Sequence, residues 1–458
     1  MVATLVRLFM FTYMACWLLI DNVAAAQQMP LIRDSEIEHI IRRWGDPLFD
    51  LANLDKKAVT IRLVNSSTLN AFVTGGQNIF LHSGLLIAST GPNQIIGVIA
   101  HEIGHLTGRH IARTDEAIRN ARNITLMHTL LGIGILAVGS ATGSTHASKA
   151  TGALVLGGGA AGVRHFLSHT RTQERAADQF ALTLLDRNKV SARGLLKFLR
   201  KFEEQELLAD FRQDPYLRTH PLTRERLTTI KYHVDTSPWS AMPIADIDLE
   251  SHARVKAKLI GFLQTPEYTF QHYPDDDRSV AARYARTIAY HRALNINASI
   301  AEIDGLIHEY PKDAYFKELK GQILFENGRL AEAWPYYDAA NSILPNDPVL
   351  MLELARLGIE LEKQPFLAKA ITALEHVVRV EPDNNVAWWL LSIGYGRVDR
   401  LAESALASGE QALLEGRSND AALHAERAGR IVPEGSPSWL RAQDLREAAR
   451  RRQSATDH

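Results

Sequence analysis

The chain has 458 residues, enough for two or three domains that each bury a substantial core. Its formal net charge is −1 at pH 7 and its pI is near 7, so the composition gives no indication of nucleic-acid binding. Aromatic residues make up only 7%, whereas Ala and Leu are abundant, which favours a mainly helical protein.

The first 26 residues have the pattern of a secretory signal peptide. Arg7 precedes an apolar run from Leu8 to Ile20, and small residues end the segment at a cleavage site near Ala26. An uncleaved N-terminal anchor is the alternative, although the run is short for a membrane span. Cys16, the only cysteine, lies inside the run. A metal in the mature chain must therefore be held by histidine and carboxylate.

Short alternating segments follow a predicted amphipathic helix over residues 34–44. Residues 59–64, 70–76 and 78–82 have the pattern of strands, and the second ends in a glycine turn. We predict a small antiparallel sheet whose edge can pair with an extended substrate backbone. The substrate-binding candidates at this edge are Asn70, Ala71 and Phe72.

A His-Glu-x-x-His motif follows in an apolar segment that begins after the Gly91–Pro92 break. If the segment is a helix, His101 and His105 lie four residues apart on one face and can bind one metal ion. Glu102 lies beside that face, where it can act as the general base for an attacking water without binding the metal. The motif therefore predicts a metallopeptidase site.

Two apolar segments follow the metal helix, at residues 124–139 and 147–163. Neither comfortably reaches the roughly 20 residues of a membrane span. A buried helical hairpin, a mobile lid and a hairpin that makes peripheral membrane contact through residues 124–163 all remain open.

A second helix is predicted to begin near His169 and to carry Glu174 and Asp178 one turn apart. Such a pair is usually a solvated helix face, but after His-Glu-x-x-His it is the natural source of a third metal ligand. Glu174 would bind the metal and Asp178 would orient a ligand histidine. His165 and His169 are alternative ligands that precede the helix.

His220 and Pro221 stand at the start of a further predicted helix, where Pro221 suits the first turn. His220 either caps this helix or lies near the metal. The sequence does not choose between these two roles.

Taken in order, these motifs resemble those of the BepA-like periplasmic zinc metallopeptidases, in the gluzincin family that includes the HtpX and CaaX prenyl proteases. The resemblance covers roughly residues 30–235 and extends to the helical tail. The matching segments are Asn70–Phe72, Gly75–Gly76, Gly84–Leu86, His101–His105, Arg171–Asp178 and His220–Leu222. The segment between the metal helix and Glu174 departs from the family pattern, because it is unusually rich in Gly and Ala.

The resemblance implies one zinc ion per chain, bound by His101, His105 and Glu174, with Glu102 as general base. It also implies that His220 matches a histidine that can take the fourth zinc position and keep the enzyme latent. A periplasmic location and protein substrates are implied in the same way.

The C-terminal part has the 34-residue period of tetratricopeptide repeats, because Pro311 and Pro345 lie 34 positions apart (345 − 311). We predict a helical solenoid over residues 275–458, with a weaker copy before Pro311 and a partial one at residues 388–397. An unrelated helical bundle is the alternative. Small and aromatic residues recur at the packing positions: Gly321, Ala333, Tyr337 and Ala340, then Gly358 and Ala370, then Gly409, Ala421 and Ala428.

We therefore expect an α+β fold, mainly α: a signal peptide (1–26), a zincin-type metallopeptidase domain (27–235), a linker (236–274) and the repeat domain (275–458). The expected function is a periplasmic zinc endopeptidase that cleaves misfolded or stalled envelope proteins, while the repeats recruit a protein partner. The alternatives are a chaperone or assembly factor for outer-membrane proteins with latent or minor protease activity, and a membrane-bound peptidase.

Overall fold

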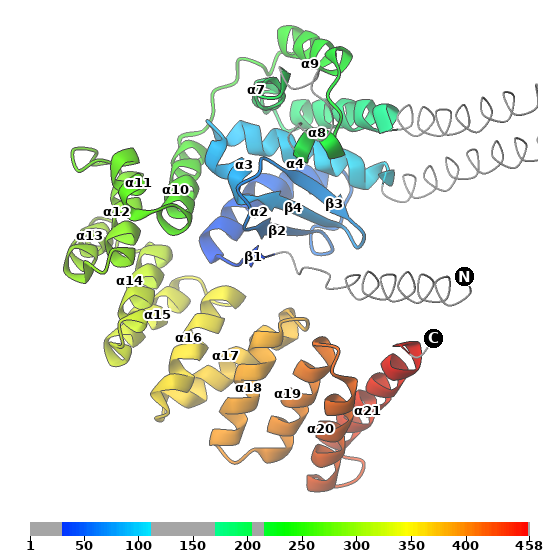
Figure 1. Ribbon diagram of the computed structural model, residues 1–458, viewed down its shortest axis with the longest axis vertical. Coiled ribbons are helices and arrows are strands. Elements are labelled where there is room, and N and C mark those ends of the chain that lie inside the picture. The colour runs from blue at the N-terminus through cyan, green and yellow to red at the C-terminus, as the bar shows by residue number, and fades with distance from the viewer. Residues whose placement is uncertain (1–29, 111–169, 204–214, 457–458) are drawn as a thin grey trace, which may run out of the picture.

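The computed structural model describes residues 30–110, 170–203 and 215–456. The chain forms an N-terminal α+β part and a C-terminal arc of helices that curves beneath it (Figure 1). The predicted signal peptide and the segment 124–163 lie outside the described residues. Among the helices that the structure describes, we find none with the length and apolar character that a membrane crossing requires.

The N-terminal part contains a small sheet with helices packed around it. Its labelled elements are β1 (Leu31–Ile32), α2 (Ser35–Leu51), β2 (Thr60–Val64), β3 (Ala71–Thr74), β4 (Asn78–His82), α3 (Ser83–Ala88), α4 (Pro92–Thr107), α7 (Arg193–Arg200), α8 (Pro215–Thr219) and α9 (Arg224–Thr236). A further helix covers residues 170–187.

The four strands form a mixed sheet in the order β1-β2-β4-β3, so the prediction of an antiparallel sheet was wrong for its central pair. The strands β2 and β4 run parallel, with Leu63 opposite Leu81, whereas β3 and β4 form an antiparallel hairpin. Alternation of side chains identifies strands, but it does not say which strand pairs with which.

The six residues between β2 and β3 explain this topology, because they pass the end of β4 and place β3 on its far side. The Ser83 hydroxyl at the end of β4 donates to the Ser66 carbonyl at 2.9 Å. Gly84 allows the crossing, since a Cβ there would lie 2.2 Å from the Ser67 carbonyl oxygen. The glycine of the Gly84–Leu86 segment therefore has a steric role in the sheet connection.

The helix α4 is the centre of the N-terminal core. Pro92 begins it, which suits a first helical turn, and Ile95, Val98 and Ile99 are fully buried. It packs between the sheet and α2 on one side and α7 and the 170–187 helix on the other (Figure 1). This burial fixes the orientation of the histidines on its last turns.

The C-terminal helices form a solenoid of antiparallel pairs, as expected (Figure 1). The predicted weaker and partial copies are regular pairs, formed by α12 with α13 and by α18 with α19. The helices are α12 (Val280–Arg292), α13 (Ile296–Glu309), α14 (Ala314–Glu326), α15 (Leu330–Ile343), α16 (Pro348–Leu361), α17 (Phe366–Val380), α18 (Asn385–Arg397), α19 (Leu401–Leu414), α20 (Ser418–Ile431) and α21 (Pro437–Thr456).

The predicted linker at residues 236–274 contains two helices, α10 (Asp246–Leu263) and α11 (Pro266–His272). The helix α10 packs against α12 of the solenoid and against α2 and α3 of the N-terminal part. A division of the chain into separate folding units at this segment therefore stays a prediction.

Buried charges join the two parts at the first turn of α2. The Glu36 side chain is buried, lies 2.6 Å from Arg254 and accepts a hydrogen bond from the Tyr284 hydroxyl at 2.8 Å. Lys258 of α10 is buried too and lies 2.7 Å from Asp34, the N-cap residue of α2. Since a buried ion that loses its partner is strongly destabilising, these contacts couple the N-terminal part to the solenoid.

Candidate active site

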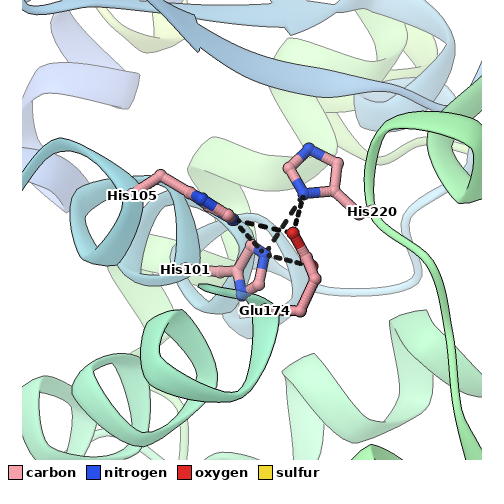
Figure 2. A group of neighbouring side chains, drawn as sticks. All are labelled: His101, His105, Glu174 and His220. Carbon is pink, nitrogen blue, oxygen red and sulfur yellow. Dashed lines mark hydrogen bonds and ion pairs between the residues drawn. The ribbon is translucent and has the colours of Figure 1, made fainter. Parts of the chain in front are cut away.

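Two buried helices and one loop bring the predicted site residues together (Figure 2). The helix α4 carries His101, Glu102 and His105, and the 170–187 helix carries Glu174 and Asp178. His220 comes from the short segment between α8 and α9. Each of these residues is at most 7% exposed, so a reaction here is shielded from bulk water.

The four possible metal ligands converge on one point. One donor atom from each of His101, His105, Glu174 and His220 lies within 4.8 Å of all the others. The Glu174 Oε1 atom is 3.2 Å from His105 Nε2 and 3.3 Å from His220 Nδ1, and the two helix histidines are 3.1 Å apart through their Nε2 atoms. Histidines four residues apart thus share one helix face, as the motif predicts.

This donor set fits a metal ion. Nitrogen lone pairs and carboxylate oxygens that face each other in a buried space need a cation between them. Both oxygens of the fully buried Glu102 accept no hydrogen bond from any described residue, and His220 Nε2 lies 3.6 Å from Oε1. A water held by a metal in this space would provide the missing donor for Glu102.

Asp178 holds the first ligand histidine from behind. Its Oδ1 atom lies 3.0 Å from His101 Nδ1, the ring nitrogen that points away from the cluster. Burial lowers the pKa of His101, but Asp178 and Glu174 outweigh burial and raise the pKa to about 10. A metal bound at His101 Nε2 would have to compete with a proton for that nitrogen. Burial lowers the pKa of His105 instead.

Glu174 is held in its ionised form. Burial raises the pKa of this carboxyl, but His220 and Arg226 with the two helix histidines bring the pKa well below its ordinary value. Burial also raises the pKa of Asp178, but Arg226 and His101 outweigh burial and bring that pKa below its ordinary value. Both carboxylates are thus available as anions, one toward the metal position and one toward His101.

Sequence reasoning missed Arg226 and His110, two buried residues of the site. Arg226 is 2% exposed and donates to both Asp178 oxygens, from Nε at 2.6 Å and from Nη2 at 2.9 Å. Its position four residues before the buried Ile230 and eight before the buried Val234 could have shown that it lies on the apolar face of α9. His110 Nδ1 lies 2.9 Å from His105 Nδ1. It therefore orients the His105 ring, in the way that Asp178 orients the ring of His101.

The predicted substrate residues lie at the edge of the sheet, beside His220. The strand β3 is the last strand of the sheet, and the buried Ala71 carbonyl accepts a hydrogen bond from His220 Nε2 at 3.2 Å. Asn70 is 7% exposed, and Phe72 stacks on Phe80 with ring centroids 5.1 Å apart. Ala71 thus faces the metal ligands, whereas the ring of Phe72 packs on the sheet.

Two helix histidines, a glutamate beside them and a carboxylate from a second helix define the class of protein: this is the constellation of a metallopeptidase. Residues 33–234 match the model of Peptidase family M48. The chain is thus a metalloendopeptidase with a C-terminal helical solenoid, similar to the BepA-like enzymes that the sequence motifs resemble.

Two of the similar proteins extend across both parts of the chain. The chain is 27% identical over 415 residues to the beta-barrel assembly-enhancing protease of Escherichia coli strain K12, covering 89% of this chain and 82% of that protein. The protein of the same name from Yersinia pestis is 25% identical over 400 residues, covering 86% and 79%. The mitochondrial metalloendopeptidase OMA1 of Saccharomyces cerevisiae is 28% identical over 229 residues, covering 47% and 60%.

Proposed function

We propose that this metalloendopeptidase uses one zinc ion per chain, with His101, His105 and Glu174 as ligands and Glu102 as general base. The observation that carries the proposal is the convergence of four donor atoms within 4.8 Å beside a buried carboxylate with no hydrogen-bond donor among the described residues. Two histidines and one carboxylate are the ligand set of several catalytic zinc sites, which keep one further position open. When bound, zinc supplies Lewis-acid activation of water and of the scissile carbonyl.

Residues of the chain would carry out proton transfer, ligand orientation and substrate binding. Glu102 takes a proton from the attacking water and gives it to the leaving nitrogen. Asp178 fixes the His101 ring, and the open side of β3 binds the substrate backbone in an extended form. Asn70, Ala71 and Phe72 would contribute this edge, with the Ala71 carbonyl as an acceptor for a substrate amide.

His220 would be inhibitory in the arrangement that the structure describes. Its Nδ1 atom lies among the metal ligands, 3.4 Å from His101 Nε2 and 3.3 Å from Glu174 Oε1. A fourth protein ligand displaces the water that must attack. Its Nε2 atom donates to the Ala71 carbonyl, so the same ring also blocks a substrate acceptor on β3. Displacement of one side chain would then open the metal position and the strand edge together.

The proposed substrates are misfolded or stalled proteins of the cell envelope, and the proposed location is the periplasm, after cleavage of a signal peptide near Ala26. This proposal rests on the relatives named beta-barrel assembly-enhancing protease, which match the chain over both of its parts. The solenoid would hold a protein partner, and residues 124–163 would supply any peripheral membrane contact. A role as an assembly factor with latent or minor protease activity is the second candidate, which the position of His220 favours.

Metal content and proteolysis of an unfolded protein, measured on the same preparations, test this function. The unaltered chain should hold about one zinc, and Glu102→Gln should keep the zinc but lose cleavage. Glu174→Ala should lose zinc. The matched control is Glu225→Gln, since Glu225 lies on the surface and forms an exposed ion pair with Arg175. Cleavage by Glu102→Gln at the unaltered rate would refute the assignment of Glu102.

A further inference from the structure

One buried guanidinium contacts three separate parts of the proposed zinc site. Arg226 lies 2.9 Å from Glu174 Oε2 through Nη1 and binds both oxygens of Asp178 through Nε and Nη2. The same Nη1 donates to the carbonyl of Pro221 at 2.8 Å, directly after His220. Arg226 comes from α9 and its partners from two other segments, so these contacts are tertiary and are not part of helix geometry.

The two oxygens of Glu174 have different surroundings because of this contact. Oε1 faces two imidazole rings, those of His105 at 3.2 Å and His220 at 3.3 Å. Oε2 faces the Arg226 guanidinium at 2.9 Å, and its distance to His101 is 3.4 Å. An oxygen paired with a guanidinium is a weaker donor toward a metal than its free neighbour.

We propose that Arg226 is a positioning residue that makes Glu174 a one-oxygen ligand and holds Asp178 against His101. This inference rests on the proposed metal site. If Glu174 bound through both oxygens, it would fill the coordination position that a catalytic zinc keeps open. Only the planar fork of arginine serves this role, because it binds the Asp178 carboxylate with two parallel N–H groups while its third nitrogen lies 2.9 Å from Glu174 Oε2. Lysine offers a single point charge.

The test compares Arg226→Lys with the unaltered chain in two measurements besides activity. Zinc affinity, from competition with a chelator, should weaken by roughly 10- to 100-fold, as for other residues that orient metal ligands. With cobalt(II) in place of zinc, the visible absorption should weaken in Arg226→Lys, because a second Glu174 oxygen raises the coordination number. The matched control is Arg175→Lys on the 170–187 helix, where Arg175 makes an exposed ion pair with Glu225. It should change neither value.

Arg226→Ala, supplied with guanidinium ion at millimolar concentration, guards against a variant that fails to fold. Rescue of zinc affinity by guanidinium but not by an ammonium salt supports the positioning role, because a merely structural residue would not depend on the planar fork. Unchanged zinc affinity and cobalt spectrum in Arg226→Lys would overturn this inference alone, and so would a lack of rescue in Arg226→Ala. A lack of stoichiometric metal in the unaltered chain would overturn the proposed zinc site as well.

Discussion

Protonation of His252, at the contact between the end of α3 and α10, should lower the free energy of unfolding. The Ser89 hydroxyl donates its one hydrogen to the Leu86 carbonyl at 2.6 Å, so the 2.6 Å contact between Ser89 Oγ and His252 Nε2 must have His252 as its donor. The proton that would charge the ring must then go to Nδ1. Burial, with a smaller contribution from Lys256, lowers the pKa of His252 from 6.5 to about 4.

The sign and size of the effect follow from this difference in pKa. Between pH 4 and 6.5 the unfolded chain binds a proton at His252 that the folded chain does not, so stability falls as the pH decreases through this window. The pKa difference of about 2.5 is worth about 3.4 kcal/mol once the pH lies below 4. At pH 5 the expected loss is about 2 kcal/mol relative to pH 7.5.

Urea unfolding followed by circular dichroism at pH 5 and pH 7.5 measures this loss. In His252→Gln, which cannot titrate but can donate to Ser89, the difference in unfolding free energy between the two pH values should be smaller by about 2 kcal/mol. The control is His272→Gln, because His272 lies on the surface of α11. If His252→Gln and the unaltered chain lost the same stability between pH 7.5 and 5, His252 would not be buried as a neutral ring and the reasoning would be wrong.

Three further changes test other parts of the structure. His220→Ala should keep its zinc and cleave an unfolded protein faster at neutral pH, whereas a loss of activity with the fold intact would contradict an inhibitory role. Burial raises the pKa of Glu318 from 4.5 to about 8, so the unaltered chain should lose stability as the pH rises through that interval, and urea unfolding of Glu318→Gln should show a smaller loss. In Gly104→Ala a Cβ would lie 2.8 Å from the Ala177 backbone. This clash should lower the unfolding free energy by about 1–3 kcal/mol and weaken zinc binding in the same chelator assay. The control Gly75→Ala, with open space around the new Cβ, should change neither value.

The site could be predicted from the sequence as far as its chemistry lies in local spacing. His101 and His105 share a face because of the helical period, and Glu174 and Asp178 do so for the same reason. The structure brings all four to one place together with His220, whose role the sequence left open. Arg226 was missed because its carboxylate partners Asp178 and Glu174 lie 48 and 52 positions away (226 − 178 and 226 − 174), and no local pattern predicts which distant carboxylate an arginine will contact.

The fold was predictable to a similar depth. The repeat period gives the helix pairs of the solenoid, since each pair is determined by residues close in the sequence. Parallel pairing of β2 with β4 depends on how six residues pass the end of a neighbouring strand, which side-chain alternation does not record. The helix α10 within residues 236–274 makes contacts in both directions, with the solenoid and with the N-terminal part, and such contacts between distant segments are not written in local sequence.

The charged contacts at the start of α2 can form only late in the synthesis of the chain. Glu36 is made 218 residues before its partner Arg254 and 248 residues before Tyr284. Until those residues have emerged from the ribosome, the first turn of α2 carries Asp34 and Glu36 without their partners, and the carboxylates stay hydrated. The helix that supports the metal-binding core thus reaches its final environment only after the first solenoid helix exists. A chain released early would hold the catalytic motif without its finished support, so the late partners of Glu36 delay the assembled protease until the solenoid has begun to form.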